Sequence, residues 1–187
     1  MALKVLDKIN TRLKFLYRKN NYLSSALRRL LCNALTQPHF DFACTAWYTT
    51  LNKKLKNKLQ VAQNKCIRFC LQLHQRTHID NNEFAKIKWL PVENRFNQCL
   101  TASAHKFING SCPLYMHDVY KESGQNRINT RGSFMKLKQT FRKTNFGQKC
   151  LSYLAPMAWN NLPDNIKAIK NFNNFKHKFK DHFFSQM

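Results

Sequence analysis

The chain has 187 residues, of which 43% are apolar and 13% aromatic, enough to bury the core of one medium-sized domain, which argues against intrinsic disorder. Thirty-two Lys and Arg residues against nine Asp and Glu residues give a formal net charge of +23, so a polyanionic partner is expected. Nucleic acid suits this charge better than a membrane does, because no apolar run approaches the roughly 18–20 residues of a membrane-spanning helix.

The cysteine content and the N-terminal stretch bear on location. Seven cysteines form no disulfide-like pattern in a chain large enough to have a core, which favours reduced thiols and an intracellular compartment, nucleus or cytoplasm. The stretch MALKVLDKINTRLKFLYRK carries a charge every few residues, unlike the apolar segment of a secretory signal.

Helical periodicity dominates the N-terminal part of the chain. A first helix is predicted over 3–18, and a second begins at Ser24 or Ser25, either of which could serve as N-cap. Pro38 interrupts or kinks this second helix. Its predicted buried face consists of four apolar residues: Leu27, Leu30, Leu31 and Ala34.

The clearest predicted helix covers 51–73 and has two chemically different faces. Its apolar positions recur at mixed spacings of three and four: Leu51, Leu55, Leu59, Ala62, Cys66, Phe69, Cys70 and Leu73. The basic residues lie across from them or near the start: Lys53, Lys54, Lys56, Lys58, Lys65 and Arg68. One face therefore suits a core and the other suits phosphates.

Cysteine and histidine recur every four residues at the end of this helix, which raises the question of a zinc site. Cys66, Cys70 and His78 match the start of a C-x3-C-x7-H knuckle, but Glu83 stands where its fourth ligand, a cysteine, is expected. An unbroken helix would spread these residues over about 18 Å. Ligands of one zinc lie near 2 Å from it, so a site would require the helix to end near Leu73. Buried thiols are the preferred interpretation, and no metal or cofactor is expected.

The second half of the sequence contains a change of period. A helix is predicted from Pro91, which suits its first position, to Gly110. The polar stretch ESGQNRINTRGS then marks a boundary, giving a helical domain over 1–122, a linker over 123–133 and a C-terminal part over 134–187.

In that C-terminal part, apolar and basic residues alternate in FMKLKQTFR, which predicts a strand, with KTNFGQ as a turn and KCLSYLA as a second strand. An amphipathic helix with Phe172, Phe175, Phe179 and Phe183 on one side is predicted to follow. The expected fold is mainly α: a helical bundle with a small C-terminal β-hairpin and a terminal amphipathic helix.

The acidic residues give no sign of a catalytic centre. Polymerases and many nucleases hold divalent metal ions with grouped carboxylates. No two of the nine acids adjoin: Asp7, Asp41, Asp80, Glu83, Glu93, Asp118, Glu122, Asp164 and Asp181. A Gly-rich phosphate loop and a G-x-S-x-G elbow are also missing from the sequence, so we expect a non-enzymatic chain.

Several stretches occur in an order that is found in a known family: INTRLKFLYRKNNYL, LRRLLCNALTQPHFDFACTAWY, LQVAQNKCIRFC, WLPVENRF, RKTNFGQKCLSYLAPMAWNNLP and FKHKFKDHFF. Together they resemble the C-terminal part of jockey-like reverse transcriptases, which belong to non-long-terminal-repeat retrotransposons. The resemblance runs over essentially all residues, and QPHFDFACTAWY, NKCIRF and WNNLP are its most specific parts.

The resemblance implies a thumb, which grips the template–primer duplex, followed by a C-terminal extension. The palm with its metal-binding Asp pair, and the endonuclease, would lie outside this chain. The expected partners are therefore RNA or an RNA–DNA duplex, bound without sequence specificity, and the palm of a reverse transcriptase. The residues expected near the nucleic-acid backbone are Arg28, Arg29, Lys53, Lys54, Lys58, Lys65 and Arg68, with Lys136, Lys138, Arg142 and Lys143 on the hairpin.

Three alternatives remain open. The chain could be a docking module whose Phe-rich terminal helix binds the palm. It could be a relic whose basic surface has no dedicated ligand and which only inherits the label of an RNA-directed DNA polymerase. It could also be a zinc module built on Cys66, Cys70 and His78.

Overall fold

The protein is described by a computed structural model, which defines residues 1–116, 136–139 and 141–186. The chain divides into two compact units, Met1–Phe96 and Asn97–Met187, which are described separately below. The boundary lies within one helix, α7 (Val92–Ile108). The linker predicted over 123–133 lies outside the described residues, and the domain limits at 122 and 134 remain predictions.

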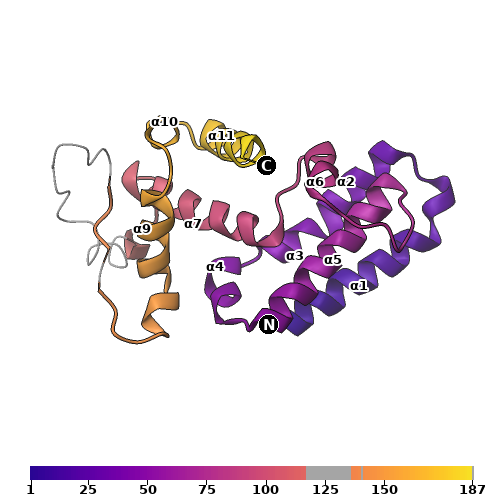
Figure 1. Cartoon of the computed structure of the whole chain (residues 1–187), viewed down its shortest axis with the longest axis horizontal. Coiled ribbons are helices and arrows are strands. Elements are labelled where there is room, and N and C mark those ends of the chain that lie inside the picture. The colour runs from indigo at the N-terminus through magenta and orange to yellow at the C-terminus, as the bar shows by residue number, and fades with distance from the viewer. Residues whose placement is uncertain (117–135, 140, 187) are drawn as a thin grey trace. The chain divides into compact units, whose positions relative to one another are not determined.

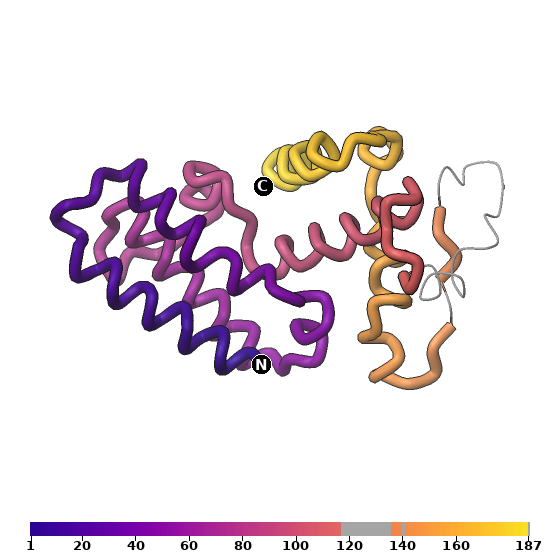
Figure 2. Tube along the Cα trace, turned by 180° about the vertical axis from the view of Figure 1, so that it is seen from behind, coloured from indigo at the N-terminus to yellow at the C-terminus, as the bar shows by residue number. Residues whose placement is uncertain are grey.

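The first unit is built on helices α1 (Ala2–Arg18), α2 (Ser25–Leu35) and α5 (Lys53–Leu71). Helix α5 contacts both of the others, and Figures 1 and 2 show α1 and α5 side by side along most of their length. Shorter helices connect them or follow: α3 (Gln37–Asp41), α4 (Cys44–Trp47) and α6 (Asn81–Ile87). Two 3-10 segments, Asn20–Tyr22 and Tyr48–Thr50, complete the connections.

Helix α5 begins and ends with recognisable caps. The side chain of Asn52 accepts a hydrogen bond from the backbone N–H of Leu55 at 2.9 Å, which satisfies a donor of the first turn. At the other end Gln72 adopts a left-handed conformation with φ of 55°, and the Leu73 N–H bonds to the Arg68 carbonyl at 2.9 Å. The helix therefore ends two residues before the predicted Leu73.

The buried side of α5 follows the predicted stripe in its middle and adds two residues to it. Leu59, Ala62, Cys66, Phe69 and Cys70 are buried as expected, while Leu51, Leu55 and Leu73 are only half-buried. Gln63 and Ile67 are fully buried as well. The Gln63 carboxamide belongs there because its Nε2–H donates to the Leu90 carbonyl at 2.9 Å.

The predicted buried face of α2 is wrong. Leu27 and Leu30 are 47% and 62% exposed, whereas Arg28 and Cys32 are buried against the rest of the unit. The Arg28 guanidinium donates to the Asn20 carbonyl at 2.8 Å and lies 5.8 Å from the centre of the Phe69 ring. A buried cation is tolerated because these partners replace its water.

The second unit contains the rest of α7, a 3-10 segment at Gly147–Lys149, and helices α9 (Leu151–Asn160), α10 (Asp164–Lys167) and α11 (Phe172–Ser185). Its centre is aromatic: the His105 ring stacks on Phe175 with centroids 4.5 Å apart and also neighbours Trp159. His105 Nε2 lies 2.7 Å from the Ile169 carbonyl. The predicted terminal helix is confirmed as α11, with Phe175 and Phe179 buried.

The predicted β-hairpin is contradicted. The described residues contain no strand, and most of KCLSYLA lies in helix α9 instead. Residues 136–139 have no regular structure, although Leu137 is buried between exposed Lys136 and Lys138, as the alternation suggested. The backbone of Leu137 is paired by one side chain: its N–H donates to Asn160 Oδ1 at 2.9 Å, and its carbonyl accepts from Asn160 Nδ2 at 2.8 Å. The Asn160 carboxamide thus forms the two backbone hydrogen bonds that a neighbouring strand would otherwise form with Leu137.

Candidate nucleic-acid interface

Three of the predicted lysines share the outer side of α5. Lys54, Lys58 and Lys65 are all exposed, and their spacings of four and seven residues place them on one face of the helix. They extend over about 16 Å at 1.5 Å per residue. We call this surface the α5 basic face. It lies beside the residues that α5 buries, on the exposed part of a helix that packs against α1 and α2.

Two other predicted residues near α5 point elsewhere. Arg68 is half-buried, and its Nε–H donates to the Thr77 carbonyl at 2.9 Å, so it fixes the loop after α5. Lys53 is exposed but lines a separate cleft at the start of the helix. The basic residues of α5 therefore have different roles: the α5 basic face is open to a ligand, Arg68 holds the following loop, and Lys53 lines the cleft.

The adjacent arginines of α2 differ in position. Arg29 is exposed and available to a ligand. Arg28 is only 2% exposed, and besides its contacts with Asn20 and Phe69 its guanidinium donates to the side-chain oxygen of Gln72, the residue that ends α5. A contact with a nucleic-acid backbone would require Arg28 to leave these partners, so its role in this structure is internal.

The four predicted residues of the second unit lie around the Leu137 segment. Lys136, Lys138 and Lys143 are exposed, and Arg142 is half-buried. The Arg142 carbonyl accepts a hydrogen bond from Gln148 Nε2 at 3.1 Å, which holds the turn that follows. These residues form a basic group of their own, without the predicted hairpin beneath it.

Helix α1 carries another basic strip, formed by exposed Lys4, Lys8 and Arg12. These charges act on His39 of α3: partial burial, followed by the positive charges of Lys8 and Arg12, lowers the pKa of its imidazole. The basic character of the first unit is therefore not confined to α5.

Cys66, Cys70 and His78, which were considered as zinc ligands, do not lie together in the structure. Cys66 and Cys70 are buried in the core, and burial, followed by the neighbouring Cys32, raises the pKa of the Cys66 thiol to about 12. His78 is exposed and pairs with Asp80 at 3.1 Å. Across the described residues, no three His, Cys, Asp or Glu side chains come together in a way that could hold a metal ion. These thiols pack as small apolar groups.

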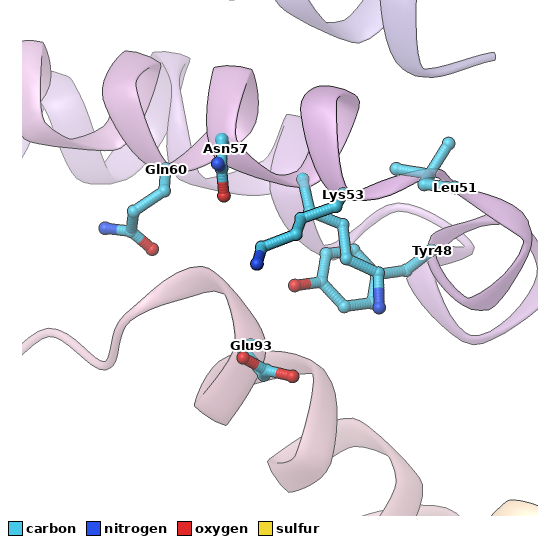
Figure 3. Close-up of a pocket in the computed structure, with 7 residues that line it drawn as sticks. Tyr48, Leu51, Lys53, Asn57, Gln60 and Glu93 are labelled. Carbon is cyan, nitrogen blue, oxygen red and sulfur yellow. The ribbon is translucent and has the colours of Figure 1, made fainter.

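A cleft between the start of α5 and the start of α7 was missed by the sequence analysis. It has a volume of about 400 Å³ and is lined by Tyr48, Leu51, Lys53, Lys56, Asn57, Gln60 and Glu93. We call it the Tyr48 cleft (Figure 3). Its residues come from segments up to 45 positions apart in sequence, and no motif signals that they converge.

Comparisons with protein-family models, with curated proteins and with solved structures find no match. Within the described part of the chain, no helix is both long enough and apolar enough to cross a membrane.

Proposed function

We propose that this chain is a non-catalytic C-terminal fragment of a jockey-like reverse transcriptase, which binds the backbone of RNA or of an RNA–DNA duplex without sequence specificity. The α5 basic face is the observation that supports binding. Its three lysines stand on a well-packed helix and project from one side, a geometry that suits contact with successive phosphates. Lysine offers point charges to phosphates and no planar pattern for base edges, so sequence preference is expected to be weak.

Exposed Arg29 and the strip of Lys4, Lys8 and Arg12 add charge to the same unit. Lys136, Lys138 and Lys143 supply a second contact region in the other unit. This distribution agrees with a ligand that presents many phosphates, because a single small anion would need only one of these groups.

The test is fluorescence anisotropy of a labelled RNA–DNA duplex over a series of salt concentrations. Each phosphate contact adds about 0.9 to the slope of log affinity against log salt for a DNA duplex, and about 0.7 for a single strand. Changing Lys54, Lys58 and Lys65 together to Gln should therefore lower the slope by about 2 to 3.

The matched control is the triple change of Lys14, Lys19 and Lys88 to Gln, which removes the same charge from exposed positions of the same unit. An equal loss in the control would assign binding to net charge alone. If the wild-type chain bound no tighter than an unfolded peptide of the same charge, the proposal would be overturned and the chain would be best regarded as a relic.

A second candidate function is docking onto a protein partner, the palm of a reverse transcriptase. The exposed apolar residues Leu27 and Leu30 on α2 favour it, because such residues side by side on a basic protein are typical of contact surfaces. If this surface binds protein, Leu27→Gln with Leu30→Gln should abolish capture of a purified palm while leaving the salt dependence of duplex binding unchanged.

A further inference from the structure

The walls of the Tyr48 cleft are held in place by interactions that leave the Tyr48 hydroxyl, the Lys53 ammonium and the Glu93 carboxylate unused. Gln60 Oε1 accepts the backbone N–H of Val92 at 3.0 Å, while its Nε2 donates to Asn64 at 2.9 Å, which ties α5 to the start of α7. The Tyr48 ring packs on Phe96 with centroids 4.7 Å apart. The Lys56 ammonium lies 4.8 Å from the centre of the same ring. The cleft is therefore preformed.

The Tyr48 ring is buried, while its hydroxyl opens into the cleft without a hydrogen-bond partner in the described part of the chain. Tyr48 is only 3% exposed, yet no donor or acceptor among the described residues pairs with its hydroxyl. Figure 3 shows this hydroxyl and the Lys53 ammonium directed toward the same space, with Glu93 facing them across the cleft. A donor that opens into a preformed cleft and has no protein partner there is free to bond to a ligand acceptor.

The charged residues that line the cleft indicate which chemical groups the ligand should carry. Lys53 and Lys56 favour an anion, while Glu93 repels one and accepts hydrogen bonds. Neither Lys53 nor Lys56 forms an ion pair with Glu93 among the described residues, so both signs are available to a ligand. A suitable ligand carries an anionic group at one end and hydroxyl donors at the other. Ribose with a phosphate meets both conditions, and carboxylates commonly bind ribose hydroxyls in nucleotide sites.

We propose that the Tyr48 cleft binds a single ribonucleotide, with the phosphate held by the Lys53 ammonium and the Tyr48 hydroxyl, and the ribose 2′-hydroxyl donating to the Glu93 carboxylate. The volume of about 400 Å³ lies within the range of small-ligand sites. Because the 2′-hydroxyl is what distinguishes RNA from DNA, this cleft gives the chain a preference for RNA that the α5 basic face alone cannot supply.

The first experiment is calorimetric titration of the full chain with adenosine 5′-monophosphate, its 2′-deoxy counterpart and inorganic phosphate. The ribonucleotide should bind tightest and phosphate weakest. Tyr48→Phe removes one oxygen and keeps the buried ring, and Lys53→Gln removes one charge; each should weaken ribonucleotide binding about tenfold, as expected for a hydrogen bond to a charged group. Lys14→Gln, which removes one charge from an exposed position outside both the cleft and the α5 basic face, should leave it unchanged.

Glu93→Gln tests the ribose contact separately from the phosphate contact. Loss of the carboxylate should strengthen phosphate binding, because a repulsive charge is gone, and should bring the ribonucleotide and deoxyribonucleotide affinities together. Equal affinities for the two nucleotides in the wild-type chain would overturn the proposal. So would an absence of saturable binding, or Tyr48→Phe and Lys53→Gln variants that bind as the wild type does.

The bound unit could be a free nucleotide or part of an RNA strand, and competition distinguishes the two. If the cleft takes a nucleotide of a strand, saturating adenosine 5′-monophosphate should abolish the preference for an RNA oligonucleotide over DNA of the same sequence. If it takes only free nucleotides, oligonucleotide binding should not respond. The triple change of Lys54, Lys58 and Lys65 tests the α5 basic face independently, since it should lower the salt slope without affecting mononucleotide binding.

Discussion

Gln63 donates a hydrogen bond from its Nε2 to the carbonyl oxygen of Leu90 at 2.9 Å, and neither residue is exposed to solvent. The bond joins the middle of α5 to the segment just before α7, and Gln60 reinforces this junction through the Val92 N–H. A buried polar contact of this kind stabilises the fold mainly because removing one partner leaves the other unsatisfied.

We therefore expect Gln63→Leu to lower the free energy of unfolding by about 2 kcal/mol, because the Leu90 carbonyl would be buried without a donor. Urea denaturation followed by circular dichroism measures this change. Val61→Ala, at an exposed position two residues away, serves as the control and should change stability little. A Gln63→Leu variant as stable as the wild type would show that water replaces the lost donor.

Gln37 is also a buried glutamine, but the opposite effect is expected there. Its Oε1 and Nε2 are both buried, and neither has a hydrogen-bond partner in the described structure. Gln37→Met keeps the length of the side chain and removes the unsatisfied groups, so stability should rise by about 1 kcal/mol. The same denaturation experiment checks it, and a loss of stability would indicate that ordered water satisfies the carboxamide.

The adjacent residues Arg28 and Arg29 should respond differently to the same substitution. Arg28→Lys replaces a buried planar cation that contacts Asn20, Phe69 and Gln72, so a loss of about 2 kcal/mol is expected. Arg29→Lys changes an exposed residue and should stay within about 0.5 kcal/mol of the wild type. In the duplex-binding assay, Arg29→Gln should lower the salt slope by about 1. Equal stability effects at the two positions would contradict the burial of Arg28.

The stability of the first unit should fall as the pH rises above about 9. Burial and the neighbouring Cys32 raise the pKa of Cys66 from its ordinary 9.0 to about 12, and burial with the Glu93 charge raises that of Tyr48 from 10.0 to about 12. The unfolded chain releases these protons at lower pH than the folded chain does. Their contribution is therefore complete below pH 9 and is lost as the pH rises toward 12.

Tyr48→Phe removes the contribution of the Tyr48 hydroxyl to this loss of stability at high pH and leaves that of Cys66. Between pH 10 and 12 the variant should lose stability less steeply than the wild type, by up to about 1.4 kcal/mol per pH unit. Urea unfolding at pH 8, 9.5 and 11 provides the comparison. Parallel pH profiles for the two proteins would mean that the Tyr48 hydroxyl ionises as readily in the folded chain as in the unfolded one.

Sequence periodicity predicted α5 and α11 well because each is long and has a continuous apolar stripe. It failed on α2, where Leu27, Leu30 and Leu31 form the more apolar side, yet Arg28 and Cys32 face the core. The reason is tertiary: besides the nearby Asn20 carbonyl, Arg28 contacts the Phe69 ring and the Gln72 carboxamide, which lie more than 40 positions away in sequence. No local pattern reports such partners, so the apolar face of an eleven-residue helix is a weak guide to burial.

The β-hairpin failed for a related reason. Alternation correctly predicted that Leu137 is buried, but Phe141, which it placed on the same side, is 83% exposed. Alternation also does not identify what pairs with the backbone. Asn160, 23 positions away, supplies both hydrogen bonds. The outer lysines of α5 could be predicted from their spacing, whereas the Tyr48 cleft could not, because Tyr48 and Glu93 meet only through the packing of α5 against the start of α7.

Gln72 ends α5 in a left-handed conformation that glycine adopts at lower cost, and the sequence contains only four glycines. A glycine there would relieve the backbone but would remove the side-chain oxygen that faces Arg28. One residue thus both turns the chain and accepts hydrogen bonds from a buried cation, so the two tasks cannot be optimised separately. Substitutions at position 72 will therefore either relieve the backbone or keep the contact that holds Arg28 of α2. Asn tolerates the left-handed conformation but has a shorter side chain, so Gln72→Asn would show how strongly the contact with Arg28 depends on side-chain length.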